Sequence, residues 1–326
     1  MKVLSLFSGA GGFDMGLENA GMKTVFQCEW DKHANTILHK HWPAVPKWED
    51  ISTLTGKHIL ANAPVTDVVA WGSPCQDLSV AGKKSGLKGE RSQLFHEGIR
   101  IIKELREETN GQYPRISIWE NVVGALNSNR GADFGVILDE MAEAGALVIE
   151  WTVLDAQYWV PQRRKRVFVI AIFDPAIANV CPDPLLPVSK SLRGHSEKGK
   201  SKRENTATDI EECFRADSRC GETILTFDTQ FGSNANVTEN IAPTLKSSQA
   251  PPSVAYPIRD TKLTMAVRRL TPLECERLNG WPDDHTRWKA DGSEQANVQR
   301  HKQCGNGVAS PVAQWIGKHL IKLGQQ

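Results

Sequence analysis

The chain has 326 residues, of which 40% are hydrophobic and 24% are charged, with a formal net charge of +1. This composition is typical of a folded globular protein and excludes disordered, collagen-like and repetitive chains. The longest apolar run, Val167 to Phe173, is far shorter than the roughly 20 residues of a membrane span, and no signal peptide is recognisable, so we expect a cytoplasmic protein without membrane contact. The seven cysteines form no CxxC pair, which argues against a metal site and a disulfide framework.

The first 175 residues alternate short β-prone apolar runs with segments that have helical periodicity. The expected strands are Val3 to Phe7, Thr24 to Cys28, Asp67 to Trp71, Arg115 to Trp119, Leu147 to Leu154 and Val167 to Phe173. The expected helices are Gly12 to Asn19, Asp31 to His41, Gln93 to Glu107 and Phe134 to Ala144. This alternation predicts an α/β fold with a doubly wound, mainly parallel sheet.

The character of the sequence changes after Phe173. A Pro-rich stretch at 181–187 is followed by a basic stretch at 190–203, which has six Lys or Arg and one Glu, and together they indicate a domain boundary. Residues 181–265 show little helical periodicity, many turn-forming residues and short β-prone pieces such as Thr223 to Phe227, which predicts a small irregular domain. Helical patterns return at Pro272 to Asn279 and at Val308 to Leu323.

A glycine-rich turn follows the first expected strand. It reads Phe7-Ser-Gly-Ala-Gly-Gly12, and Glu29 stands 20 residues after its first glycine. Glycines let a nucleoside approach the backbone, and a carboxylate accepts from ribose hydroxyls. Because Asp14 occupies the place of a dinucleotide motif's third glycine, we expect a cofactor without a dinucleotide phosphate. Trp30 could stack on an adenine ring, and Asp50 could accept a hydrogen bond from the adenine amino group. A tight turn with a solvated Glu and a core Trp would give the same sequence pattern.

Cys75 follows the third expected strand, in the sequence Gly72-Ser-Pro-Cys-Gln76. The carboxyl ends of parallel strands are where ligands collect, so Cys75 is a candidate nucleophile, with a buried structural Cys as the alternative. The next segment, Val80 to Arg91, contains three glycines and resembles a lid that contacts phosphates, unless it is a solvated loop. Its cations are Lys83, Lys84, Lys88 and Arg91.

Charged residues also flank the later strands. Glu120 follows the fourth expected strand, and a basic run from Gln162 to Arg166 precedes the sixth. Arg164 and Arg166 share one face of an extended chain. Because the fifth strand leads through a short loop into the sixth, the two can pair antiparallel, which would bring the arginines to the sheet edge of Glu120 and Cys75.

Six short blocks, in this order, resemble the signature motifs of the DNA cytosine-5 methyltransferase family, and in particular its single-chain prokaryotic and phage members. They are Phe7-Ser-Gly-Ala-Gly-Gly12, Pro74-Cys-Gln76, Glu120-Asn-Val122, Gln162-Arg-Arg-Lys-Arg166, Arg268-Arg-Leu-Thr-Pro272 and Gly305-Asn-Gly307. One block alone can arise by chance, but six in order very rarely do. The resemblance covers nearly the whole chain except residues 181–265.

The resemblance implies methyl transfer from S-adenosylmethionine to C5 of a cytosine flipped out of a short duplex sequence, through a covalent bond between Cys75 and C6. It implies that Glu120 contacts N3 and N4 of the cytosine, and that Arg166, supported by Arg164, contacts O2. The residues that would line the cofactor site are Phe7, Gly9, Gly11, Glu29, Trp30, Asp50, Ile51, Pro74, Leu94, Asn306 and Val308.

The resemblance also implies a division of the chain into a catalytic, cofactor-binding domain, 1–180 plus 300–326, and a target-recognition domain, 181–299. The expected partner is double-stranded DNA, alongside a companion restriction endonuclease that is no stable subunit, and the protein would be a monomer. Expected DNA contacts are Lys83, Lys84, Arg91, Thr244 and the basic stretch 190–203. Candidate base-reading residues are Arg215, Arg219, Gln230, Asn234 and Asn236.

Two positions depart from the family pattern. Ser73 stands where many members have Pro, which affects loop stiffness, and Gly307 stands where relatives often have Ser.

Three other functions can be weighed against this one. An RNA (tRNA) cytosine-5 methyltransferase would use the same Cys and Glu, although a separate recognition region favours duplex DNA. A non-catalytic DNA-binding regulator is disfavoured because each expected catalytic residue is present. A methylase of exocyclic amines would usually carry an Asp/Asn-Pro-Pro-aromatic turn, which is absent at Ser73-Pro-Cys75.

Overall fold

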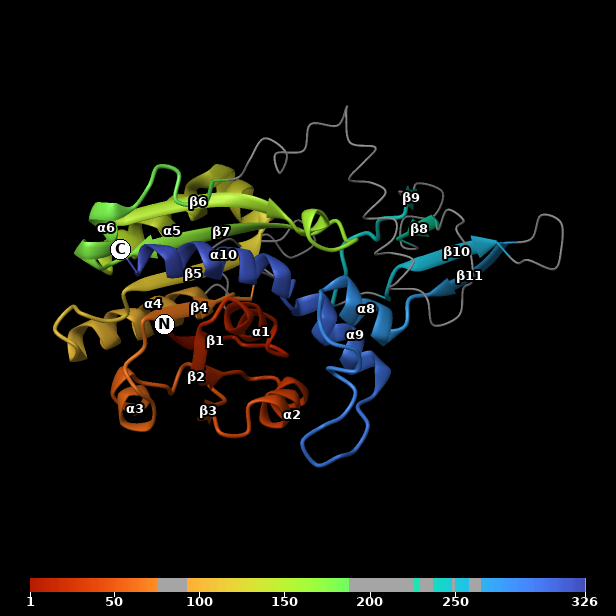
Figure 1. Cartoon of the computed structure of the whole chain (residues 1–326), viewed down its shortest axis with the longest axis horizontal. Helices are drawn as coiled ribbons and strands as arrows, with labels where there is room; N and C mark the ends of the chain where they lie inside the picture. Colours follow the sequence, from red (N-terminus) through yellow and green to blue (C-terminus); the bar gives the residue numbers. More distant parts are fainter. Residues whose placement is uncertain (75–92, 188–224, 229–236, 248–249, 258–264, 326) are drawn as a thin grey trace. The chain divides into compact units, whose positions relative to one another are not determined.

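The computed structural model describes residues 1–74, 93–187, 225–228, 237–247, 250–257 and 265–325. The chain forms two compact units (Figure 1). Unit 1 comprises Met1–Leu154, Lys165–Pro187 and Ala313–Gln326, and unit 2 comprises Asp155–Arg164 and Val188–Val312. Compared with the boundaries expected from the sequence, unit 2 also includes the loop 155–164 and residues 300–312, whereas residues 181–187 belong to unit 1.

Unit 1 is built on a seven-stranded sheet with the strand order β3-β2-β1-β4-β5-β7-β6. The strands are β1 (Lys2–Leu6), β2 (Lys23–Cys28), β3 (Lys47–Trp48), β4 (Val68–Trp71), β5 (Ile116–Val122), β6 (Val148–Asp155) and β7 (Lys165–Ile172). All of the pairings among β1 to β5 are parallel. The predicted doubly wound, mainly parallel sheet is confirmed, and its order reverses between β1 and β4, where ligands bind in such folds.

Strand β7 runs against its neighbours. It pairs antiparallel with β5 over seven residue pairs, from Ile116 opposite Ile172 to Val122 opposite Arg166. At its other edge lies β6, and the amide of Leu147 donates to the carbonyl of Ile172 (2.7 Å), so the start of β6 meets the end of β7. The predicted antiparallel pairing is therefore correct, and it places Arg166 beside the carboxyl end of β5.

Helices cover both faces of this sheet. In unit 1 they are α1 (Gly12–Asn19), α2 (Lys32–His41), α3 (Gly56–Asn62), α4 (Gln93–Glu108), α5 (Ala132–Glu143), α6 (Pro175–Val180) and most of α10 (Ser310–Leu323), with the 3-10 segment η2 (Val123–Gly131). On one face, Phe13 of α1 packs edge-on against Phe168 of β7, and Gly317 of α10 lies close against Leu17 and Ala20. Helices α4 and α5 pack on the opposite face.

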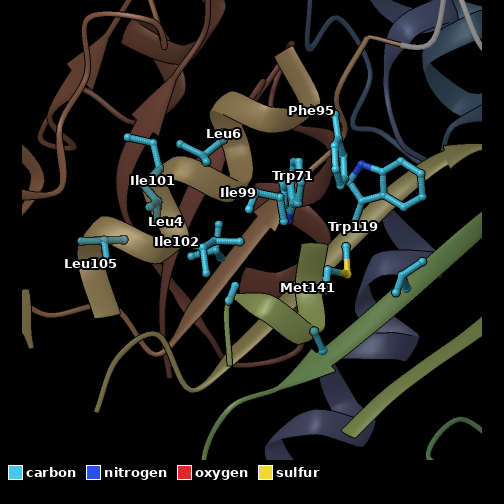
Figure 2. Packing of buried hydrophobic residues seen from close by; sticks show 14 of the residues in the cluster. Leu4, Leu6, Trp71, Phe95, Ile99, Ile101, Ile102, Leu105, Trp119 and Met141 are labelled. Carbon is cyan, nitrogen blue, oxygen red and sulfur yellow. The ribbon is translucent and has the colours of Figure 1, made fainter. Parts of the chain in front are cut away.

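The core on the α4 side centres on three aromatic rings (Figure 2). Trp71 of β4 stacks on Phe95 of α4 with 5.3 Å between ring centroids, and Trp119 of β5 meets Phe95 edge-on at 5.8 Å. These rings are almost fully buried, and burial of this apolar area is the main stabilising contribution to the unit. Gly98 of α4 lets the helix approach, because a Cβ there would lie 2.4 Å from the Trp71 ring.

Unit 2 contains a four-stranded antiparallel sheet with the order β11-β10-β8-β9. Its elements are β8 (Leu225–Phe227), β9 (Val237–Glu239), β10 (Ser253–Pro257), β11 (Met265–Arg269), α8 (Pro272–Leu278) and α9 (Asn297–Asn306), together with the 3-10 turn η3 (Ala156–Tyr158). The region expected to be irregular is thus more regular than predicted. Strands of three to five residues are too short to show a periodicity in sequence.

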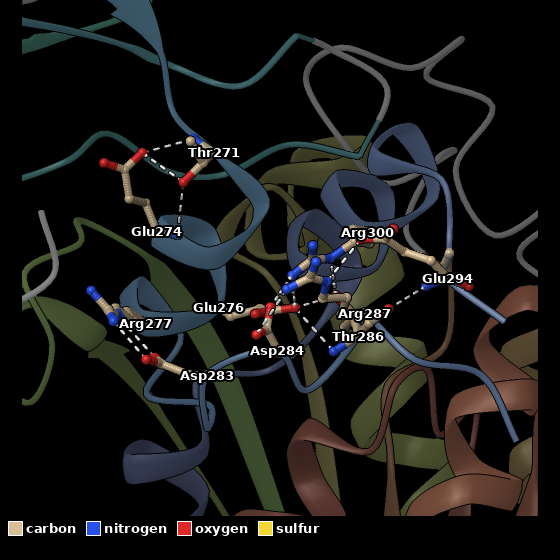
Figure 3. A network of polar contacts seen from close by, with 11 residues as sticks. Thr271, Glu274, Glu276, Arg277, Asp283, Asp284, Thr286, Arg287, Glu294 and Arg300 are labelled. Atoms are coloured by element: carbon tan, nitrogen blue, oxygen red, sulfur yellow. Dashed lines mark hydrogen bonds and ion pairs between the residues drawn. The ribbon is translucent and has the colours of Figure 1, made fainter. Parts of the chain in front are cut away.

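A buried ionic network joins the helices of unit 2 (Figure 3). Arg300 of α9 donates to Glu276 of α8 (3.0 Å) and to Thr286 Oγ1 (3.2 Å). Thr271 and Glu274 form a capping box at the start of α8, which satisfies backbone donors that a helix N-terminus leaves unpaired. The helix predicted to begin at Pro272 is confirmed.

No helix among the residues that the structure describes is both long enough and apolar enough to span a bilayer.

We predict that Gly98→Ala lowers the free energy of unfolding by about 1–3 kcal/mol, because the new methyl overpacks the Trp71 ring. Gly135→Ala is the matched control in α5, where no described atom lies within 4 Å of the added Cβ; it should stabilise by roughly 0.5–1 kcal/mol through the helix propensity of Ala. Urea denaturation measures both changes. Equal effects of the two substitutions would contradict this account of the core.

Candidate active site

The glycine-rich turn after β1 is closed by Glu29. Phe7 and Gly9 both have positive φ angles, +54° and +56°. One Glu29 carboxylate oxygen accepts from the Gly9 amide and the other from the Asp31 amide, each at 2.7 Å. Desolvation raises the pKa of Glu29 above its ordinary value. The Glu29 carboxylate therefore links the glycine turn to the residues after β2, and its expected contact with ribose hydroxyls stays a prediction.

The surface beside this turn fits a nucleoside. Among the described residues, no atom lies within 4 Å of the place where a Cβ on Gly9 would stand, so the backbone is open to close approach. The Trp30 side chain is 71% exposed, which is unusual for a large aromatic ring. Asp50 accepts from the Ser52 amide (2.9 Å) and hydroxyl, whereas Ile51 is buried and Leu94 is half-buried. An adenosyl group has hydroxyl and amino donors and a flat adenine face. The carboxylates match the donors, the exposed indole matches the adenine face, and the open glycine permits close approach of the group to the backbone.

Asp14 lies beneath the same turn, in the first turn of α1. Its carboxylate is fully buried and accepts from Ser5 Oγ of β1 (3.0 Å) and from Gln27 Nε2 of β2 (2.9 Å). Desolvation raises the pKa of Asp14 from 3.8 to about 6, against the opposing effect of these hydrogen bonds. Asp14, which occupies the place of the third glycine of a dinucleotide motif, is thus a buried acid that links β1 and β2 to α1.

Glu120 and Arg166 meet where β5 and β7 leave the sheet. Arg166 Nε lies 3.0 Å from Glu120 Oε1, and the side chains are only 14% and 11% exposed. Arg166 stands one register step from Asn121 and two from Glu120, so the antiparallel pairing itself brings the guanidinium to the carboxylate. A Cβ on Gly72 would lie 3.2 Å from Glu120 Oε2. The acid therefore stands directly beside the turn that leads to Pro74.

Two residues beside Glu120 hold this turn, and the sequence analysis did not single them out. Trp119 Nε1 donates to Ser73 Oγ (3.1 Å), and Asn121 Nδ2 donates to the Ser73 carbonyl (3.2 Å). Pro74 follows and is exposed. The sequence did contain one signal for this contact, since Ser73 is a departure from the family pattern.

Four of the predicted site residues belong to unit 2. The Arg164 guanidinium is buried and donates to the carbonyls of Leu245 (3.2 Å), Gly305 (3.1 Å) and Gly307 (2.6 Å). Arg164 therefore ties together the segment after Thr244 and the turn that contains Asn306. The hydroxyl of Thr244 donates to the Arg163 carbonyl, and the Val308 carbonyl accepts from Trp281 Nε1 (3.0 Å). These contacts organise unit 2, and the catalytic support expected of Arg164 stays a prediction.

Several expected site residues lie outside the described part of the chain. They are Cys75, Lys83, Lys84 and Arg91, the basic stretch 190–203, and the candidate base readers Arg215, Arg219, Gln230, Asn234 and Asn236. Their predicted roles stay predictions. The described residues nevertheless bring together, in unit 1, the glycine turn, Glu29, the turn before Cys75, Glu120 and Arg166.

Comparison with a solved structure shows which fold the chain has. Over 99% of its length, the chain matches the crystal structure of S. pombe Dnmt2 methyltransferase, covering 98% of that chain, with a TM-score of 0.69 and 19% sequence identity. At this identity the likeness concerns the fold, which is that of the methyltransferases.

Comparison with sequences defines the family. The model of the C-5 cytosine-specific DNA methylase family matches residues 1–322. Type II methyltransferase M2.BsuMI of Bacillus subtilis is 31% identical, with 98% of this chain and 75% of the relative covered. Type II methyltransferase M.HpaII of Haemophilus parainfluenzae is 27% identical, with coverage of 98% and 89%. The chain belongs to the C-5 cytosine-specific DNA methylase family: it is a DNA cytosine-5 methyltransferase and uses a methyl donor of the S-adenosylmethionine type.

We predict that Asp14→Asn becomes more stable relative to wild type as the pH rises. The folded-state pKa of Asp14, about 6, exceeds its unfolded value of 3.8, so the wild type loses stability from this group as the pH rises between those values. The difference in free energy of unfolding should change by about 2 kcal/mol in favour of the variant between pH 4.5 and pH 7. Urea titrations across this range measure it, and a difference independent of pH would contradict the assignment.

Proposed function

We propose that the chain methylates C5 of a cytosine flipped out of duplex DNA, with S-adenosylmethionine as donor, Cys75 as nucleophile, Glu120 as acid and Arg166 as the contact to cytosine O2. The observation that carries this proposal is the Glu120–Arg166 pair, with 3.0 Å between its atoms, beside the turn that leads to Cys75. An acid and a guanidinium side by side can contact one pyrimidine along its N3, N4 and O2 edge. The two residues come from adjacent, paired strands, so the strand register sets the spacing of their main chains.

Cytosine C5 is too weak a nucleophile to take a methyl group unaided. Addition of the Cys75 thiolate to C6, with transfer of the Glu120 proton to N3, converts the ring into an enamine whose C5 is nucleophilic. Bound S-adenosylmethionine supplies an electrophilic methyl group on a sulfonium. After C5 has taken the methyl group, its proton leaves to a base, the thiolate is eliminated from C6 and the N3 proton returns to Glu120. The ring regains its aromaticity and the enzyme its starting state.

The cofactor is proposed to lie over the glycine turn. Gly9 would let the amino-acid and ribose parts approach the backbone, and the remaining lone pairs of Glu29 would accept from ribose hydroxyls. The exposed Trp30 ring offers a face for adenine, and Asp50 an acceptor for its amino group. Phe7, Gly11, Ile51, Pro74 and Leu94 are proposed to line the rest of the site. Asn306 and Val308 are proposed as further cofactor contacts, as the family resemblance implies.

Unit 2 is proposed to read the DNA target. Residues 181–299, with their separate antiparallel sheet, would supply base contacts, and Thr244 with the cations at 83, 84, 91 and 190–203 would contact DNA. Because the relatives are named type II methyltransferases, we propose a companion restriction endonuclease and a monomeric methyltransferase. Bisulfite sequencing of host DNA with and without the protein identifies the target, and methylation of transfer RNA in place of duplex DNA would favour the RNA alternative.

We predict that Cys75→Ser abolishes methyl transfer, because a serine hydroxyl is a far weaker nucleophile than a thiolate at neutral pH. S-adenosylmethionine should bind with nearly unchanged affinity in calorimetry. Duplex DNA with 5-fluorocytosine at the target position should trap the wild type covalently and leave the variant untrapped, because fluorine at C5 blocks release of the adduct. Turnover by the variant would refute the mechanism and with it the proposed role of Cys75.

We predict that Glu120→Gln lowers the single-turnover methylation rate about 100-fold or more, because an amide cannot transfer a proton to N3. The affinity for DNA, measured by fluorescence anisotropy, should change little. Glu143→Gln is the control, since its carboxylate lies on an exposed part of α5. An equal loss in rate and in DNA affinity would reassign Glu120 to binding.

A further inference from the structure

Strands β4 and β5 carry two tryptophan–serine pairs that mirror each other. Trp71 stands opposite Trp119 in the parallel register. Trp71 Nε1 donates to Ser117 Oγ of β5 (2.8 Å), and Trp119 Nε1 donates to Ser73 Oγ, just past the end of β4 (3.1 Å). All four side chains are buried, and a buried indole N–H needs such an acceptor.

The two pairs have the same chemistry but different positions. Ser117 lies inside β5, where its main chain is already held by the strand ladder on both sides. Ser73 lies beyond the last residue of β4, in the turn that leads to Pro74 and Cys75. Its hydroxyl accepts from Trp119 and its carbonyl accepts from Asn121, so the two neighbours of Glu120 in the sequence both hold it.

The same aromatic cluster holds the chain on the far side of Cys75. Phe95 begins the buried face of α4, the helix that follows residues 75–92, and it contacts both tryptophan rings (Figure 2). Trp119 therefore touches the residue two before Cys75 through a hydrogen bond and the following helix through its ring. The two contacts thus attach the described residues on either side of 75–92 to β5, the strand that carries Glu120.

A serine before the Pro-Cys sequence is conformationally freer than a proline, whose ring restricts φ. The main chain at Ser73 is therefore restrained by its partners, and one of them is the indole of Trp119. Proton transfer and thiolate attack on a single cytosine depend on the relative placement of Cys75 and Glu120. A misplacement of about 1 Å between reacting groups can cost about 100-fold in rate.

We propose that the hydrogen bond from Trp119 to Ser73 is a positioning contact for methyl transfer, which fixes the main chain before Cys75 relative to Glu120. Ser73 and Trp119 act through Cys75 and Glu120 and touch neither substrate nor cofactor. The proposal rests on the proposed role of Cys75 as nucleophile. It assigns a role to Ser73, whose hydrogen bonds restrain a residue that lacks the restraint of a proline ring.

The test is a double-mutant cycle on the full chain with Ser73→Ala, Trp119→Phe and the double variant, and with Ser117→Ala as the matched control. Ser117→Ala removes an equally buried tryptophan–serine hydrogen bond without touching the turn. Single-turnover methylation of a duplex that contains the target sequence gives the rate, calorimetry gives the affinity for S-adenosylmethionine, and urea denaturation gives the stability of each variant.

We expect Ser73→Ala and Trp119→Phe each to lower the single-turnover rate about tenfold, and the double variant to lose no more than either one, because all three lack the same contact. The affinity for S-adenosylmethionine should stay within about twofold. Ser117→Ala should lose comparable stability to Ser73→Ala but keep its rate within about twofold.

Two results would overturn the proposal. One is that the rate losses of Ser73→Ala and Trp119→Phe multiply in the double variant. The other is that Ser117→Ala loses as much of the single-turnover rate as Ser73→Ala. The Cys75→Ser variant separates this outcome from a failure of the proposed function. Inactive Cys75→Ser together with such results would reject only the positioning contact, whereas active Cys75→Ser would reject the role of Cys75 itself.

Discussion

The antiparallel pairing of β7 with β5 is the constraint on which the candidate site depends. A parallel sheet gathers the carboxyl ends of its strands at one edge, and residues at the amino end of a further parallel strand would lie at the opposite edge. Because β7 is reversed, its first residues return to the edge where β5 ends, and Arg166 meets Glu120 within 3.0 Å. A hairpin from β6 makes this reversal possible with a short connection, which runs through residues assigned to unit 2.

Around that edge, buried polar groups hold the turns in place through hydrogen bonds. Glu29 closes the glycine turn through two amides, Asp14 joins β1 and β2 beneath it, and Trp119 and Asn121 hold the turn at Ser73. Buried polar groups are costly unless they are hydrogen-bonded, so each of these contacts strongly restricts the geometry of its turn. Desolvation outweighs the hydrogen bonds at Asp14 and Glu29 and raises the pKa of each carboxyl.

Much of the fold was predictable because long elements of unit 1 have clear periodicity. The strands of the central sheet are apolar on both faces, as β4 with its four buried residues illustrates, and helices α1, α2 and α4 were predicted within one residue at either end. Helix α3 was missed because only two of its seven residues are buried, and α9 because it is mostly polar. The sheet of unit 2 was not predicted as a sheet, although a β-prone piece at Thr223 to Phe227 was recognised, because its strands have only three to five residues and show no periodicity in the sequence.

The sequence by itself determined the family and the candidate chemistry, because six short motifs in order specify residue types that the reaction needs, and it placed the strands that carry them. Only the tertiary structure separated Arg164 from Arg166, which share one face of an extended chain: Arg166 pairs with Glu120 in unit 1, whereas Arg164 binds three backbone carbonyls in unit 2. It alone joined Ser73 to Trp119, 46 residues apart. The physical reason is that motifs record chemical identity locally, while partners in a hydrogen bond or ion pair are chosen by strand register and packing.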